Sequence, residues 1–249
     1  MPLSGIHHTV IDDDGFPPTT LPDRQAGAGM TILFLLLTTL SSIRADSSSE
    51  AYFPWTQGDS WVYDTIKKGE KEPFEMKVVI EGPWGGREFA KNLKDQGVVV
   101  ENASLPGGMI MTQKDKRGTM REFLLRTKKG IFIQRLGLSK SFTPEVFTHF
   151  NPPVPRLIFP LEPGTKVHWE GRLKIAWVDK PILFDGEVMG WEDIEVPAGK
   201  FHCIKLHYHE KRGEEIIDEN VWYAEGIGQV KYDGGQYIKE LKSYKAKSD

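Results

Sequence analysis

The chain has 249 residues, of which 27% are charged, and its formal net charge is −3 at pH 7. Residues 1–45 hold four of the acidic and two of the basic residues, so the remainder carries 31 acidic and 30 basic ones. This balance gives no electrostatic reason to bind nucleic acid or an anionic membrane. The single cysteine, Cys203, excludes an internal disulfide, so a domain of about 200 residues must be held by its core.

The first element along the chain is a short apolar run, ILFLLLTTL at residues 32–40, which follows an internal methionine, Met30. Nine residues are too few to cross a bilayer, which takes about 20 residues of helix, but they match the apolar region of a secretory signal. The alternative is a buried strand or short helix of the domain. We predict a signal peptide at residues 30–45, cleaved after Ala45, and export to the bacterial periplasm or the medium, with no integral membrane span.

Residues 1–29 are rich in Pro, Gly and Asp and have no apolar period. We expect them to be disordered or to lie upstream of the true start codon. Residues 46–249 are then a single β domain.

From residue 51 onward, apolar residues alternate with polar ones, most clearly at residues 74–81, 173–177 and 204–209. A period of two is typical of half-buried strands, and glycine-containing turns follow at regular intervals. Only residues 87–94 and 143–150 are candidates for short helices. The pattern predicts an all-β fold: an antiparallel meander of about ten strands that forms a barrel, half-barrel or sandwich.

A short motif occurs twice. FPWTQG at residues 53–58 precedes Trp61 and Tyr63, and FPLEPG at residues 159–164 precedes Val167 and Trp169 at the same offsets. A proline-led turn that leads into a strand explains this spacing. The motif either starts two related halves, residues 51–138 and 159–244, or two segments of one meander, or is a coincidence.

Residues 139–158 form a Pro-rich segment between these halves; six of the sixteen prolines lie between Ser139 and Pro163. Because proline cannot donate a hydrogen bond to a sheet, we expect a crossing loop rather than a central strand. Its phenylalanines would plug the open side of the sheet, or the segment would pack on the surface as a linker.

Three blocks carry a family resemblance: YFPWTQGDSWVY at residues 52–63, VPAGKFHCIKL at residues 196–206 and VWYAEGIGQVKY at residues 221–232. They resemble a group of uncharacterised bacterial exported β-proteins that contain a domain of unknown function. The resemblance implies an antiparallel β fold, akin to the curved sheets of periplasmic lipid carriers, and an envelope location. It implies no catalytic residues.

The candidates for chemistry are few. Cys203, His207 and His209 share one strand face, and the two histidines have the i, i+2 spacing that can bind one metal ion, whereas Cys203 lies about 13 Å from His207. A solvated strand face explains the same residues. An acidic cluster at residues 214–219 fits a charged hairpin tip, and no common catalytic motif is found.

Seven tryptophans remain, and large aromatic residues on strands fill a core or line a ligand cavity. If a cavity exists, we expect Trp61, Tyr63, Trp169 and Trp177 to bind its ligand. The favoured function is a non-catalytic envelope protein that binds an apolar small molecule, a lipid or a partner segment on a curved sheet, without a cofactor. The alternatives are a secreted hydrolase using carboxylates or a histidine-bound metal, and a subunit of an envelope assembly.

Overall fold

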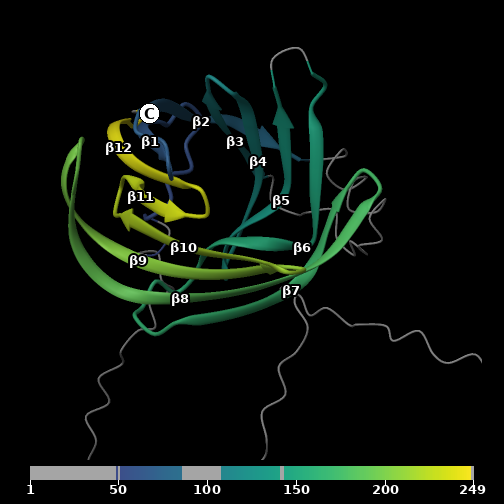
Figure 1. The fold of residues 1–249 in the computed structure, drawn as a ribbon. Helices are drawn as coiled ribbons and strands as arrows, with labels where there is room; N and C mark the ends of the chain where they lie inside the picture. The colour runs from purple at the N-terminus through teal and green to yellow at the C-terminus, as the bar shows by residue number, and fades with distance from the viewer. Residues whose placement is uncertain (1–48, 50, 86–107, 141–142, 248–249) are drawn as a thin grey trace, which may run out of the picture. The chain divides into compact units, whose positions relative to one another are not determined.

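The computed structural model describes residue 49 and residues 51–85, 108–140 and 143–247. Within them, twelve antiparallel strands form one closed barrel, in which each strand pairs with its neighbours in sequence and β1 pairs with β12 (Figure 1). The strands are β1 (Ser60–Lys67), β2 (Phe74–Trp84), β3 (Gly108–Asp115), β4 (Gly118–Thr127), β5 (Gly130–Ser139), β6 (Val146–Ile158), β7 (Lys166–Ile175), β8 (Val178–Val196), β9 (Gly199–Arg212), β10 (Glu215–Ala224), β11 (Gly228–Gly234) and β12 (Tyr237–Lys245). The predicted all-β meander is confirmed as a barrel, with two strands more than expected.

The predicted signal peptide at residues 30–45, residues 1–29 and the helix candidate at residues 87–94 lie outside the described residues. In the described part of the chain, no helix is long and apolar enough to span a membrane.

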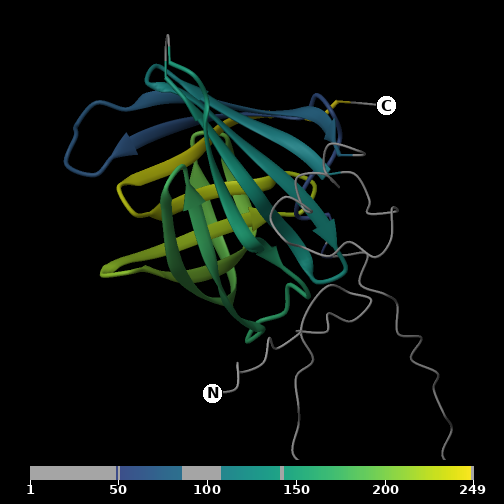
Figure 2. The same ribbon diagram turned by 90° about the vertical axis from the view of Figure 1, so that its right-hand side faces the viewer.

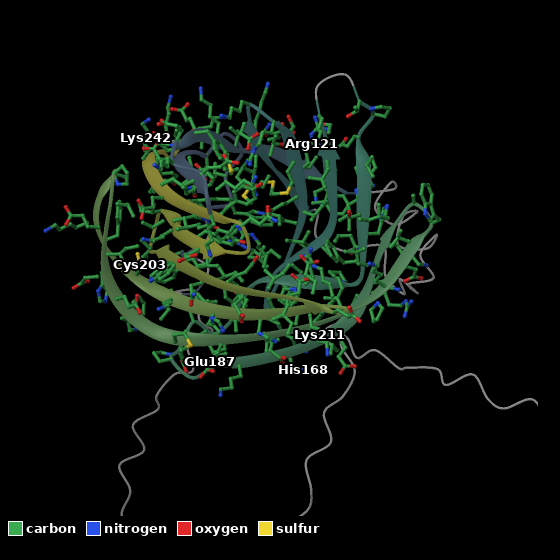
Figure 3. All side chains as sticks on the ribbon, in the orientation of Figure 1. Arg121, His168, Glu187, Cys203, Lys211 and Lys242 are labelled. Atoms are coloured by element: carbon green, nitrogen blue, oxygen red, sulfur yellow. The ribbon has the colours of Figure 1, made fainter. Side chains whose placement is uncertain are left out.

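Alternation along each strand places one face in the barrel interior, which side chains fill (Figure 3). In β2, for example, Phe74, Met76 and Val78 are buried, while Glu75 and Lys77 between them are exposed. The same alternation in β9 buries Leu206 and Tyr208. The period of two in the sequence therefore corresponds to side chains that point alternately into and out of the barrel.

The Pro-rich segment differs from the expectation. Residues of β6 pair with both β5 and β7, so the segment is a strand of the barrel rather than a crossing loop or a helix at residues 143–150. The pairing with β5 stops at His149 and resumes at Val154, which leaves Pro152 and Pro153 in a gap of that ladder. Proline is tolerated there because the gap requires no backbone donor. Phe150 points into the core from the wall itself, so the segment completes a closed barrel and the prediction of a loop that plugs an open side of the sheet is wrong.

The repeated motif has the same backbone arrangement in both copies. Gly58 and Gly164 have φ of +98° and +88°, and their amides donate to the carbonyls of Ile80 and Val188, both at 2.8 Å. Each glycine takes a conformation that side chains disfavour, which explains the fixed glycine of the motif. The first copy precedes β1 and the second precedes β7, six strands later.

The segment before β1 covers one end of the barrel. Tyr52 and Phe53 are buried, and the carbonyl of Ala51 accepts a hydrogen bond of 2.9 Å from the amide of Gly226 in the β10–β11 turn. Arg126, at the end of β4, donates to the carbonyl of Phe53 at 3.0 Å. The turns of β1–β2, β9–β10 and β11–β12 project from the opposite end (Figure 2).

Candidate functional site

An ionic network crosses the barrel interior and is centred on Arg156 of β6. Its Nε lies 3.2 Å from Oε2 of Glu122 in β4, and both side chains are largely buried. Nη1 donates to the hydroxyl of Tyr223 in β10 and Nη2 donates to Oε1 of Gln229 in β11, both at 2.9 Å. One guanidinium on β6 thus contacts β4 on one side and the adjacent strands β10 and β11 on the other.

The network continues to Lys239 on β12. Glu122 Oε1 accepts a hydrogen bond of 2.5 Å from Gln113 Nε2 in β3, and Gln113 Oε1 accepts one of 2.9 Å from Lys239 Nζ. Buried charges are tolerated only when they are paired and hydrogen-bonded, and this network meets both requirements at Glu122.

Burial sets the protonation of these groups. Desolvation lowers the pKa of Lys239 to about 8, although Glu122 opposes the shift. Burial also disfavours the charged form of Arg156, but Tyr223 and Glu122 outweigh it and raise the pKa of the guanidinium, which stays charged. Burial raises the pKa of Tyr63, so its hydroxyl stays protonated. Lys239 is therefore the network member closest to titrating near neutral pH.

A cavity of about 30 Å³ lies beside this network. A cavity of that size holds one or two water molecules. Its polar wall consists of Gln113, Arg156, Gln229 and Lys239, with Tyr63 beside them. Its apolar wall consists of Phe53, Pro54, Trp61, Val78 and Met111. Phe53 and Pro54 belong to the segment that covers the barrel end, so this segment closes the cavity.

The structure brings two of the four predicted ligand residues to the cavity. Trp61 and Tyr63 line it, and they donate hydrogen bonds to the carbonyls of Ile227 at 2.7 Å and Gln229 at 2.8 Å. Trp169 is buried in the core but does not line the cavity. Trp177 is 93% exposed, because β7 ends at Ile175 and the alternation does not extend through the turn.

The sequence reasoning missed the charged residues of the site. Glu122 lies between Met120 and Leu124, and Lys239 lies between Tyr237 and Leu241, in the same alternation as apolar residues. A charged residue at an inward position of a predicted strand is the signal that could have found them.

The predicted metal candidates lie on the outer side of β9. His209 Nδ1 is 2.8 Å from Asp218 Oδ1, and His207 Nδ1 is 3.2 Å from Asn220 Oδ1. Cys203 is on the same strand (Figure 3) but is fully buried, and burial raises its pKa to about 12, so the thiol is protonated. Among the described residues, no three side chains of the metal-binding types are grouped to hold an ion.

The acidic hairpin residues face two directions. Asp218 contacts His209 on the outer side of the barrel, while Glu219 accepts a hydrogen bond of 2.5 Å from the hydroxyl of Tyr232. Burial, with Glu219 nearby, raises the pKa of Tyr232. The cluster is therefore divided between the two faces of β10.

The comparison with family models matches the last third of the chain. Residues 178–246 match the model of the DUF3108-like family. This range contains the blocks at residues 196–206 and 221–232 that carried the resemblance. Comparison with curated proteins finds no match.

Two solved structures are similar at low identity. A Bacteroides fragilis protein with a YmcC-like fold, inferred to be exported, has a TM-score of 0.46 and 16% identity, covering 78% of this chain and 98% of that one. A protein from Parabacteroides distasonis, inferred to be a lipoprotein, has a TM-score of 0.42 and 15% identity, with the same coverage of 78% and 98%.

Proposed function

We propose that the protein is an exported, non-catalytic barrel that binds a ligand with an apolar body and a polar end. The observation that carries this proposal is the cavity, which joins five apolar residues to two cations and two amides. The polar wall presents the donors of Arg156 and Lys239, so it suits an acceptor such as a carboxylate or carbonyl oxygen. Trp61 and Tyr63 would contact the ligand body.

A ligand larger than water requires the covering segment to move. The barrel wall is closed by strand pairing all around, so the end covered by Phe53 and Pro54 is the entrance. Residues 51–57 make no backbone–backbone hydrogen bond to a strand and are held by single contacts such as the hydrogen bond from Gly226 to Ala51, whereas Gly58 and Asp59 are bonded to Ile80 of β2. Segments held in this way open at lower free energy than paired strands.

Export is the second part of the proposal. It is supported by the apolar run at residues 32–40 and by the resemblance of three blocks to exported proteins. Fractionation of the host cell, followed by sequencing of the protein's N-terminus, tests it. A processed chain that begins at Asp46 in the envelope or medium is the expected result, and an unprocessed cytosolic chain would contradict it.

Ligand binding is tested on protein purified from its own host. Native mass spectrometry and solvent extraction should reveal a co-purifying small molecule with an apolar body. A fluorescent fatty acid then serves as a defined probe, and its saturable binding should weaken in Lys239→Met. Lys200→Met is the matched control, since Lys200 is exposed and outside the cavity.

A barrel without a co-purifying molecule and without saturable probe binding would overturn the proposal. Equal weakening in the Lys200 control would assign the probe signal to surface charge instead.

A further inference from the structure

The tip of the β7–β8 hairpin, residues 175–178, consists of four consecutive apolar residues, of which Ala176 and Trp177 are exposed and Ile175 and Val178 are half-buried. Ala176 and Trp177 form the two-residue turn, and Ala176 has a φ of +48°, a left-handed conformation that L-residues other than glycine rarely adopt. Trp177 is 93% exposed, and within the described part of the chain its side chain makes no ring contact or hydrogen bond. A strained turn that holds the largest side chain in solvent indicates a surface with a binding role.

Positive charge surrounds this tip. Between residues 172 and 180, Arg172, Lys174 and Lys180 stand against one carboxylate, Asp179. Asp179 contacts Arg172 Nε at 2.7 Å and Lys174 Nζ at 3.8 Å, so it neutralises about one of the three cations. The charge balance of the whole chain therefore does not hold at this tip.

We propose that the β7–β8 tip docks into the interface of an anionic lipid bilayer. Trp177 would lie at the level of the headgroups, where its amphipathic ring is favoured, and the cations would contact lipid phosphates. Lys180 is three residues from Trp177, about 10 Å along the strand, which matches the depth to which interfacial segments are buried.

A bilayer fits this tip better than a protein partner does. A stable protein interface buries about 800 Å² on each side, whereas one exposed tryptophan with its turn offers about 200 Å². A convex tip with an aromatic residue at its apex and cations behind it needs no complementary pocket in order to enter a lipid interface.

The test measures Trp177 itself. The full chain is mixed with phosphatidylglycerol-containing vesicles whose acyl chains carry bromine, which quenches tryptophan fluorescence on contact. We expect quenching that disappears in Trp177→Phe and persists in Trp191→Phe. Trp191 is the matched control because it is also partly exposed, at 44%, but is stacked on His202. All tryptophans lie after residue 54, and any quenching caused by binding of the predicted leader would persist in Trp177→Phe.

Charge is tested separately. Lys180→Gln should lower the vesicle partition coefficient roughly fivefold, as expected for one surface charge, and phosphatidylcholine vesicles should bind weakly. Circular dichroism checks that each variant is folded. Quenching that is equal in Trp177→Phe and wild type would overturn the proposal. Loss of a co-purifying protein in Trp177→Ala, with vesicle binding unchanged, would also overturn it in favour of a protein partner.

Discussion

Arg156 and Glu122 form an ion pair inside the barrel, with Nε and Oε2 3.2 Å apart and side-chain exposures of 16% and 6%. They come from β6 and β4, which are separated in the sheet by β5. The pair therefore spans the inner face of β5, and it holds the guanidinium of Arg156 at the wall of the cavity.

Glu122→Gln should lower the free energy of unfolding by about 3–5 kcal/mol, because it leaves a buried guanidinium without its counter-charge. Urea denaturation measures this difference. Glu187→Gln, which breaks an exposed pair with Lys166, is the control and should cost less than about 1 kcal/mol. Glu122→Gln combined with Arg156→Met should recover part of the loss, and strict additivity of the two changes would show that the pair is not coupled.

Lys239 should make stability depend on pH. Its pKa falls from the usual 10.5 to about 8 in the folded protein, so the unfolded chain binds the proton more tightly. Unfolding then takes up a proton between these two values, and the free energy of unfolding rises with pH across this window. From pH 7.5 to 9.5 we expect a gain of about 2 kcal/mol relative to Lys239→Met.

Wild type and Lys239→Met should be compared only below about pH 10. Above that pH, buried tyrosines such as Tyr63 and Tyr223 change the stability in the opposite direction. Their pKa is raised in the folded state, so the unfolded chain loses those protons first and stability falls. Parallel pH curves for wild type and Lys239→Met would contradict the assigned shift.

Alternation of apolar and polar residues, together with the glycine turns, predicted most of the strands that form the barrel wall. The period of two in β2 and β9 and the glycine turns reveal strands, because alternation and turn chemistry depend only on near neighbours. The alternation rule wrongly placed Trp177 at a cavity, since periodicity does not show where a strand ends. At β6 the rule about proline failed because a gap in the ladder, visible only in three dimensions, accommodates Pro152 and Pro153.

The site was harder to predict than the wall. Trp61 and Tyr63 could be named because aromatic residues on strands suggest a cavity in any barrel. Arg156 could not be distinguished from a surface arginine, since its partners come from β4, β10 and β11. Contacts between strands so distant in sequence depend on how the barrel closes, and one sequence does not specify this.

The two copies of the repeated motif share one backbone arrangement, and glycine variants test whether the two turns contribute equally to stability. Gly58→Ala and Gly164→Ala should each lower the free energy of unfolding by about 1–2 kcal/mol, because alanine disfavours a positive φ. Asparagine tolerates that region, so Gly164→Asn should cost less than Gly164→Ala. Thermal or urea unfolding measures the series. A neutral Gly164→Ala beside a costly Gly58→Ala would show that the turns are not equivalent.

Phe53 should control entry to the cavity. Its ring is 5% exposed and closes the apolar wall, so Phe53→Ala removes packing from the covering segment and increases the fraction of molecules in which it is open. Apparent affinity scales with that fraction, and the loss of a buried ring makes opening easier by at least about 1.4 kcal/mol. We expect the fluorescent fatty acid to bind about tenfold more tightly, as measured by titration. Phe74→Ala removes an equally buried ring, 8% exposed, at the opposite end of the barrel and should leave the affinity unchanged. An equal gain in both variants would mean that the probe binds a loosened barrel rather than this cavity.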